Sequence, residues 1–435
     1  MALTTVKIQR KKNGSVKQAK AIHDPLHMTD RMVATQEAEA DTIPMSTVII
    51  PGTVVSEVET VVSLQSTAAA AAAAARDALM RVTTPPRSPA AGTRVLLDRV
   101  RAGFIGLALG DALGVPHEFG RAKEYTGQLY LANKMTSQWQ AARTMGIGQI
   151  SDDTEMAITL ARSLIEGQGW HEEIVANGYM EWANSKSPWL GKQTRALFVG
   201  LTTYPGFLKR YTKLCGTTPT AAREMLAAGQ AGPGENMQSN GSLMRCFPLA
   251  CMWNLEVGGD DAALTNPSSV NYRVGIYYVN LIRLALTGAT AADVWTQAVA
   301  SADHPSIVMA VEAVSAGEVW TLADTKEKKA KGWVINSLYA GLACLYAMAV
   351  NPAITYGELM RWVIGDHPKS DTDTNAAIAG SLIGALMGWD RLLAEEQANI
   401  DIMLNMTETE IPRPPQYGLG DMEEICQALT HLSSL

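Results

Sequence analysis

From Thr93 onward, long helical segments alternate with short turns, and the strand-like alternation of apolar and polar residues is almost absent. The longest helical segments are residues 95–113, 153–166, 270–286, 334–350 and 373–389. Alanine, glycine and small polar residues recur inside these segments, which allows helices to approach one another closely. We therefore expect residues 95–435 to form one all-α domain, a compact helical bundle.

Residues 1–94 have a different character. A basic start is followed by a β-leaning stretch at 46–51, eight alanines at 68–75 and a proline-rich joint at 85–89. The alanine run favours a helix but has almost no apolar face to bury, so alone it is marginal. We expect a partly ordered N-terminal extension that serves as a tether, a lid or a partner-binding arm.

The composition excludes several classes of protein. The 435 residues are 47% apolar and 18% charged, with a net charge of −7, as in soluble globular proteins. An acidic chain is not an obvious nucleic-acid binder, and neither a secretion signal nor a membrane span is evident. The five cysteines are scattered without metal-ligand spacing, which favours a reducing cytoplasm.

The first of four segments with unusual polar residues is 103–119. Three glycines recur in it at four-residue spacing, which lets a backbone or a ligand approach one helix face: Gly106, Gly110 and Gly114. Asp111 and Glu118 lie on the same segment, and we expect Pro116 to end the helix and leave Glu118 in a loop. For this segment alone, simple helix packing with two solvated acids is the favoured explanation.

The second segment, 146–157, contains Ser-Asp-Asp-Thr-Glu at the start of a predicted helix. Ser151 or Asp152 can cap that helix, but capping needs only one acceptor. Adjacent carboxylates also repel one another unless a cation neutralises them. The segment therefore favours a cation site over a simple cap.

The third segment, 366–376, also leads carboxylates and hydroxyls into a helix. Asp371, Asp373 and Thr374 are spaced so that one turn can aim all three at one point. A calcium-binding EF-hand is excluded, because Ala376 and Leu382 stand where that loop needs Gly and Glu. Two such clusters, each opening a helix, favour one shared binuclear site for Mg2+ or Mn2+, although two unrelated helix caps remain the alternative.

The fourth segment, 239–245, is a polar glycine turn before a predicted helix. Asn240, Gly241 and Ser242 present backbone N–H groups that suit phosphate or ribose oxygens. Taken alone, the motif is weak, and a structural turn is its commoner meaning.

In this order, the motifs GLALGDALGVPHEF, SDDTEMA, NGSLMR and SDTDTNAAIAG resemble the ADP-ribosylglycohydrolase family, which includes dinitrogenase reductase-activating glycohydrolases and ADP-ribosylarginine hydrolases. The resemblance covers about residues 94–389. It implies an all-α orthogonal bundle with two Mg2+ or Mn2+ ions in a cleft. It also implies hydrolysis of the N-glycosidic bond between ADP-ribose and a protein side chain, with arginine the expected acceptor.

The resemblance also implies roles for individual residues. The metal ligands by position are Ser151, Asp152, Asp153, Asp371, Asp373 and Thr374. Glu118 and Asp153 are the candidates for the carboxylate that activates water, and the choice between them stays open. The expected substrate contacts are Asp111, Gly148, Asn240, Gly241, Ser242 and Lys369. Lys369 stands where the family often has glycine, so it either contacts the diphosphate or narrows the cleft.

The chain is also similar to bacterial immunity proteins of this family, which counter an ADP-ribosyltransferase toxin. That similarity implies an ADP-ribosylated protein as substrate and a toxin-blocking role for residues 1–94, whose basic start could mimic an arginine-bearing substrate. Two alternatives remain: a non-catalytic inhibitor that binds through the extension, and a regulatory hydrolase of an endogenous protein. We expect a cytoplasmic protein without nucleic-acid or membrane partners.

Overall fold

The computed structural model describes residues 89–120, 124–129, 132–135, 143–317, 331–367, 369–406 and 411–433. Residues 1–88 lie outside these ranges, so the partial order and the partner-binding role expected of the extension stay predictions. Only the last part of the predicted extension, residues 89–94, is described, and it forms the beginning of the first labelled helix. The domain boundary at residue 94 likewise stays a prediction.

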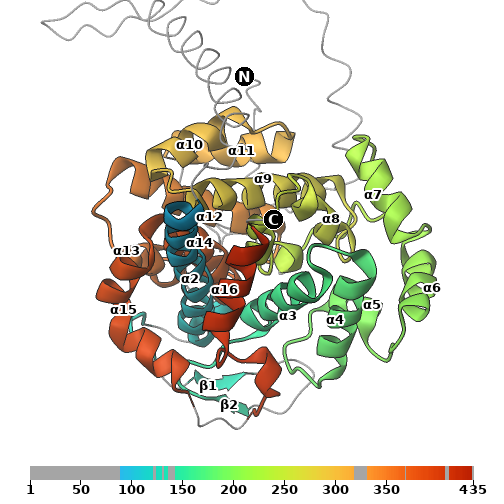
Figure 1. The fold of residues 1–435 in the computed structure, drawn as a ribbon, viewed down its shortest axis with the longest axis horizontal. Coiled ribbons are helices and arrows are strands. Elements are labelled where there is room, and N and C mark those ends of the chain that lie inside the picture. The colour runs from blue at the N-terminus through green and yellow to red at the C-terminus, as the bar shows by residue number, and fades with distance from the viewer. Residues whose placement is uncertain are drawn as a thin grey trace, which may run out of the picture. The chain divides into compact units, whose positions relative to one another are not determined.

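The described chain is all-α, as predicted (Figure 1). Its α-helices are α2 (Pro89–Gly114), α3 (Asp152–Gly167), α4 (Glu172–Asn184), α5 (Lys192–Phe198), α6 (Tyr204–Cys215), α7 (Pro219–Ala227), α8 (Val257–Ala263), α9 (Ser269–Leu286), α10 (Ala291–Ala300), α11 (Pro305–Ser315), α12 (Val334–Val350), α13 (Tyr356–Met360), α14 (Thr372–Met387), α15 (Trp389–Leu404) and α16 (Met422–Leu432). Short helical turns are η2 (Val115–Gly120), η3 (Asn240–Ser242), η4 (Phe247–Cys251), η5 (Arg361–Gly365) and η6 (Pro415–Tyr417). One antiparallel ribbon pairs β1 (Ala132–Met135) with β2 (Arg143–Met145).

The predicted helices occur close to their expected bounds. α12 has the predicted limits, whereas α2 begins six residues early, at Pro89. The segment predicted at 373–389 is divided, because Gly388 has a φ of +77° and separates α14 from α15. Glu118 does not lie in a loop as expected: α2 ends at Gly114, and Glu118 follows in the helical turn η2.

α14 is the central helix of the core. All its residues from Thr372 to Ala385 are buried, so it has no solvent-facing side over that length. It packs against α2, α9 and α12. Two tyrosine hydroxyls tie this core together through backbone carbonyls: Tyr278 of α9 donates to Ile378 O (2.9 Å), and Tyr356 of α13 donates to Gly106 O (2.7 Å).

The backbones of α2 and α14 touch through the glycines of α2. A Cβ atom on Gly110 would lie 2.2 Å from the carbonyl oxygen of Ala376. A Cβ on Gly114 would lie 2.4 Å from the Cα of Asp373. Of the two uses predicted for these glycines, the structure shows the approach of a backbone. The contact places the end of α2 directly against the start of α14.

The described residues show no helix long and apolar enough to cross a membrane. All five cysteines are buried and none forms a disulfide.

Because α2 and α14 are in close contact, we expect one methyl group added between them to lower the stability of the protein strongly. Gly110→Ala should lower the free energy of unfolding by about 3 kcal/mol, because its Cβ has no room beside Ala376. Chemical denaturation of the full chain measures this. Gly420→Ala is the matched control, since nothing lies within 4 Å of the Cβ it adds. Equal stability of the two variants would contradict the packing argument.

Candidate metal centre

Three carboxylates converge where α2 ends and α14 begins. Glu118, Asp371 and Asp373 each offer an oxygen, and these three atoms lie within 4.8 Å of one another. Asp371 and Asp373 are buried, while Glu118 is half-buried. The group contains only oxygen donors, which suit hard divalent cations such as Mg2+ and Mn2+.

Asp111, near the end of α2, connects the second segment, residues 146–157, to this end of the helix. It is fully buried and accepts from the backbone N–H of Ser151 (2.9 Å) and Thr154 (3.2 Å). It also accepts from the Thr154 hydroxyl (2.6 Å), and the Ser151 hydroxyl lies 2.8 Å from its other oxygen. The first turn of α3 is therefore capped by an acid from α2. Ser151 has the N-cap position, but its own side chain makes no capping bond.

Asp153 shows why a cation fits this arrangement. One of its oxygens lies 2.9 Å from the Ser151 hydroxyl. The other, Oδ1, is buried, and none of the described residues donates a hydrogen bond to it. An unsatisfied buried carboxylate oxygen is costly, and a bound cation would remove that cost.

Burial and mutual repulsion act on the whole cluster. Burial raises the pKa of Asp153 well above the ordinary carboxyl value, and the charges of Asp111, Asp152 and Asp371 raise it further. The pKa of Asp373 is raised in the same way, first by burial and then by Glu118 and other acids. Half-buried Asp152 also has a strongly raised pKa, from burial and then from Asp111 and Glu118. The acids from 111–118, 151–153 and 371–373 thus form one cluster.

The Asn240 turn borders this acidic cluster. The Asn240 side-chain amide donates to Asp371 Oδ2 (2.9 Å) and to the Ser337 hydroxyl (3.1 Å). Ser337 in turn donates to Asn375 Oδ1 (2.7 Å), one residue beyond Thr374. Thr374 itself donates its backbone N–H to Asp373 (2.9 Å). Asn240 and Thr374 therefore adjoin the carboxylates as the sequence suggested, although their roles stay predictions.

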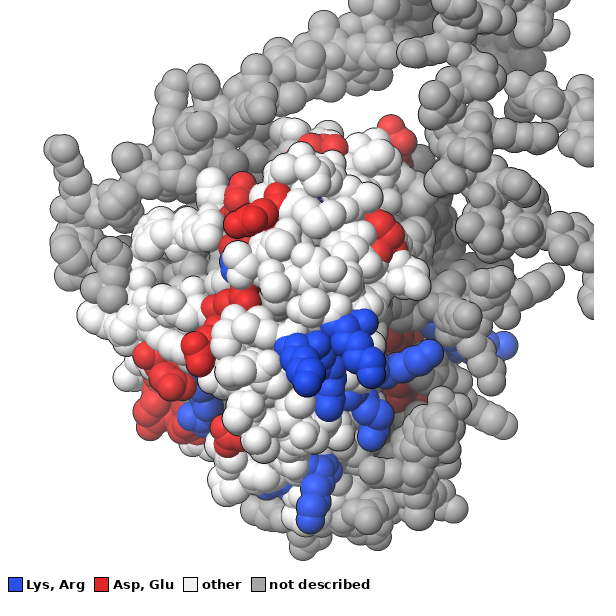
Figure 2. All heavy atoms as spheres, turned by 90° about the vertical axis from the view of Figure 1, so that its right-hand side faces the viewer, with Lys and Arg blue, Asp and Glu red and all other residues white. Residues whose placement is uncertain are grey.

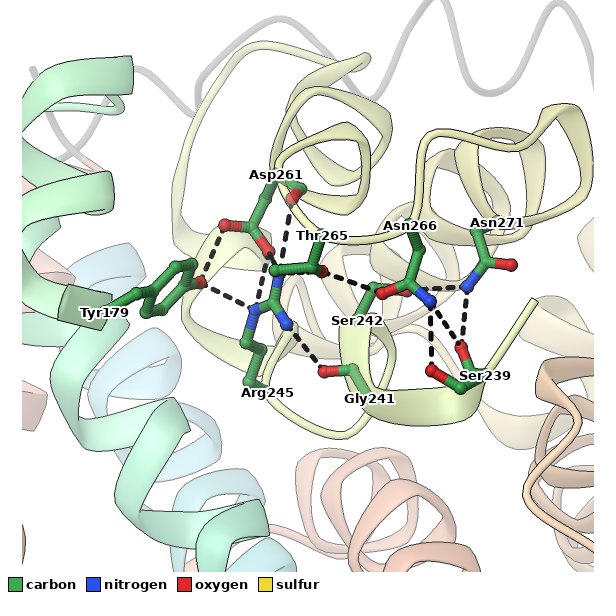
Figure 3. A network of polar contacts seen from close by, with 9 residues as sticks. All are labelled: Tyr179, Ser239, Gly241, Ser242, Arg245, Asp261, Thr265, Asn266 and Asn271. Atoms are coloured by element: carbon green, nitrogen blue, oxygen red, sulfur yellow. Dashed lines mark hydrogen bonds and ion pairs between the residues drawn. The ribbon is translucent and has the colours of Figure 1, made fainter. Parts of the chain in front are cut away.

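A buried ion pair between Arg245 and Asp261 supports the Asn240 turn (Figure 3). Arg245, 1% exposed, bonds Asp261 through Nε (3.0 Å) and donates through Nη1 to Gly241 O (2.7 Å). The Tyr179 hydroxyl donates to the other oxygen of Asp261 (2.7 Å) and accepts from Arg245. Sequence reasoning missed Arg245 as a supporting residue, although it ends the NGSLMR motif.

The other residues predicted to contact substrate make contacts within the protein itself. The Ser242 hydroxyl accepts from Asn271 Nδ2 (2.9 Å). Gly148 has a φ of +78° and packs against α15, where an added Cβ would lie 3.0 Å from Met403 Cα. Lys369 is exposed, and its carbonyl accepts from Lys331 Nζ (2.5 Å). Substrate contact by Gly148, Gly241, Ser242 and Lys369 stays a prediction.

The third acid of Ser-Asp-Asp-Thr-Glu is paired with an arginine. Glu155 binds Arg413 through both oxygens (2.7 and 2.9 Å) and accepts from Trp182 Nε1 (2.8 Å). Arg413 also donates to the carbonyl and hydroxyl of Ser185. This pairing ties α3 to the C-terminal part of the chain, and no local motif around Arg413 signals it.

The raised carboxyl pKa values predict a specific pH dependence of stability. Above about pH 4, the folded cation-free protein holds more protons on these acids than the unfolded chain does. Its stability must therefore fall as pH rises. In EDTA we expect a lower Tm at about pH 8 than at about pH 6, and added Mg2+ should raise Tm more at the higher pH, because ligands must be deprotonated.

Calorimetry of the full chain and of Asp153→Asn measures both effects. The variant removes one repelling carboxyl and should show a smaller pH slope and a weaker response to Mg2+. Identical slopes for the two proteins would contradict the assignment of the slope to this cluster.

Comparison with known proteins agrees with the four motifs. The sequence model of the ADP-ribosylglycohydrolase family matches residues 92–409. The chain is 26% identical over 320 residues to a putative ADP-ribosyl glycohydrolase of Acanthamoeba polyphaga mimivirus, covering 66% of this chain and 86% of that protein. It is 36% identical over 154 residues to the ADP-ribosyl-(dinitrogen reductase) glycohydrolase of Rhodospirillum rubrum, covering 35% of this chain and 44% of that protein.

A third relative and a solved structure extend the comparison. An ADP-ribosylarginine hydrolase of Pseudomonas putida is 24% identical over 302 residues, covering 67% of this chain and 71% of that protein. A solved chain from an ADP-ribosylglycohydrolase-related protein complex has the same fold, with a TM-score of 0.50 and 23% identity over 78% of this chain and 99% of that one. Because the family's own sequence pattern runs through most of the all-α domain, this chain belongs to the ADP-ribosylglycohydrolase family.

Proposed function

We propose that the chain is a metal-dependent hydrolase that removes ADP-ribose from a modified protein side chain, with arginine as the acceptor. The observation that carries the proposal is the convergence of Glu118, Asp371 and Asp373, with the Asn240 turn at its border. Asp152 and Asp153 interact with these acids through their charges. Arginine as acceptor is supported by the likeness to the Pseudomonas putida ADP-ribosylarginine hydrolase.

The cluster supports two Mg2+ ions as cofactors, with Mn2+ as the alternative. The residues that would hold them are Ser151, Asp152, Asp153, Asp371, Asp373 and Thr374. Glu118 lies close enough to Asp371 and Asp373 to contribute an oxygen as well. When bound, such ions would act as Lewis acids on the substrate and would orient the ribose hydroxyls and a water. The unpartnered Oδ1 of Asp153 and the repulsion among these acids support cation binding.

The protein's own residues then have separate tasks. Asp111 holds the Ser151 end of α3 in place rather than reaching solvent, since it is fully buried. The Asn240 turn receives the ADP-ribose beside the cluster. A carboxylate, Glu118 or Asp153, accepts a proton from the attacking water as the bond from ribose C1'' to nitrogen breaks. The water oxygen bonds to C1'', and the proton taken from water passes to the leaving guanidino nitrogen. The surrounding carboxylates stabilise the positive charge that develops on the ribose.

The activity can be tested directly with two modified peptides. We expect free ADP-ribose from an ADP-ribosylarginine peptide in the presence of Mg2+, loss of that activity in EDTA, and little or no release from an ADP-ribosylserine peptide. Release that is unchanged by EDTA would contradict the metal requirement. Release only from the serine peptide would contradict arginine as the acceptor.

Two variants connect this activity to the cluster. Asp152→Ala and Asp373→Ala should each lower kcat by at least about 100-fold while the far-UV circular dichroism stays unchanged. Asp401→Ala is the matched control, because Asp401 is an exposed acid on α15. Full turnover in both cluster variants would rule out the assigned site.

The immunity role is a further part of the proposal. The family match begins at residue 92, so the preceding residues have no counterpart in the family pattern and are available for a separate task, such as blocking an ADP-ribosyltransferase toxin. Removing residues 1–88, which leaves α2 complete, should weaken protection of cells against such a toxin while hydrolysis of the arginine peptide continues.

Asp373→Ala in the full chain separates the alternatives in the same protection assay. A purely binding inhibitor would protect cells fully with this substitution. A regulatory hydrolase of an endogenous protein would give no protection with or without residues 1–88, and that result would overturn the immunity role.

A further inference from the structure

A basic face covers α5 and α6. We use this name for the exposed side chains of Lys186, Lys192, Arg195, Lys209 and Lys213 together with half-buried Arg210. Figure 2 shows a group of blue side chains on the face where Figure 1 places these helices, beside separate red groups. The net charge of −7 gives no hint of this concentration of cations.

The amino-acid sequence has the same segregation of charge. Residues 182–223 contain seven Lys and Arg and no Asp or Glu. The rest of the chain has 29 basic residues against all 43 acidic ones. A continuous stretch of this length without one acid is therefore specific to the part of the chain that includes α5 and α6.

The cations of this face lack acidic partners. Among the described residues, none of the five exposed side chains forms an ion pair, whereas other arginines do, such as Arg223 with Glu172 (2.5 Å). Arg210 donates to Val199 O (2.6 Å), which attaches α6 to the end of α5. Like charges gathered on one face repel one another, so an external anionic surface would stabilise them.

The basic face adjoins the candidate active site through one residue. Gln193, next to Lys192 at the start of α5, accepts from Asn266 Nδ2 (2.8 Å) and from the Ser239 hydroxyl. Ser239 precedes Asn240, which donates to Asp371. The hydrogen bonds that fix the Asn240 turn thus also fix the start of α5. A protein whose modified side chain enters the site would lie next to this face.

We infer that the basic face docks an acidic surface of the ADP-ribosylated protein, beside the modified residue. This inference rests on the proposed hydrolase function and adds the charge of the preferred substrate. The face is too broad for the substrate's diphosphate alone, since α6 by itself is about 18 Å long. A long nucleic acid is disfavoured, because the rest of the chain has 29 basic against 43 acidic residues and offers no excess of cations for a polyanion that extends beyond the face.

Matched peptides test the inference. They carry ADP-ribosylarginine flanked by glutamates, by serines or by lysines. We expect kcat/KM for the glutamate peptide to exceed that for the serine peptide by about tenfold, through KM, and the lysine peptide to be the poorest. The preference should shrink when NaCl rises from about 25 mM to about 250 mM, because the screening length shortens.

Two triple variants of the full chain identify the face. The neutral variant, Arg195→Ser with Lys209→Ser and Lys213→Ser, should hydrolyse glutamate and serine peptides equally well. The charge-keeping variant, Arg195→Lys with Lys209→Arg and Lys213→Arg, should retain the preference. A wild-type protein without any preference, or a neutral variant that keeps it, would overturn the inference.

A binding measurement keeps this test independent of the hydrolase proposal. Fluorescence anisotropy with an unmodified glutamate-rich peptide should show salt-sensitive binding that the neutral variant loses, even if no peptide is hydrolysed. A single-stranded DNA oligonucleotide serves as the competing probe. If the face binds this DNA and not the peptide, it is a nucleic-acid surface and the inference fails.

Discussion

The backbone contact between α2 and α14 determines how the acids at the end of α2 and at the start of α14 lie relative to one another. Two helices can approach this closely only where one has no side chain, and Gly106, Gly110 and Gly114 provide that surface along one face of α2. Because the contact continues to Gly114, the turn that carries Glu118 follows immediately beside the first residues of α14. The glycines that carry no chemistry themselves thus set the distance between carboxylates more than 250 residues apart in the sequence.

Asp111 extends this arrangement to a third helix. It lies on α2, yet its carboxylate accepts hydrogen bonds from the first N–H groups of α3. A side chain at the start of the helix itself ordinarily accepts these bonds. Asp152 and Asp153 are then not needed as caps. The cost is a buried carboxylate beside other acids, and its charge raises the pKa of Asp152 and Asp153. Among the described residues, none donates a hydrogen bond to Asp153 Oδ1. Helix ends that favour negative charge offset part of that repulsion, and the cations of our proposal would offset more of it.

Local patterns in the sequence were sufficient for the helices and for the acidic segments, because both depend on near neighbours in the chain. The division at Gly388 and the ribbon of β1 and β2 were not predicted, since one depends on a single φ angle and the other on a short pairing with weak propensity. The pairs Arg413–Glu155 and Arg245–Asp261 join elements whose relative placement only the fold determines. The same is true of Asp111, whose expected contact with substrate gives way in our proposal to support of α3. Buried partners of this kind leave no spacing that a sequence pattern can reveal.

Charge has opposite signs inside and outside the site. In the proposed reaction, the buried acids would attract cations and would suit a leaving group that becomes a guanidinium. The basic face lies on α5, whose Gln193 shares hydrogen bonds with the Asn240 turn, and on the neighbouring α6. A substrate surface that carried acids next to its modified arginine would therefore meet attraction in both places. A surface with the opposite pattern would be repelled by the basic face before its side chain reached the acids. Because salt screens the interactions at an exposed face much more than those in a buried cluster, ionic strength would change substrate preference far more than it changes the chemistry.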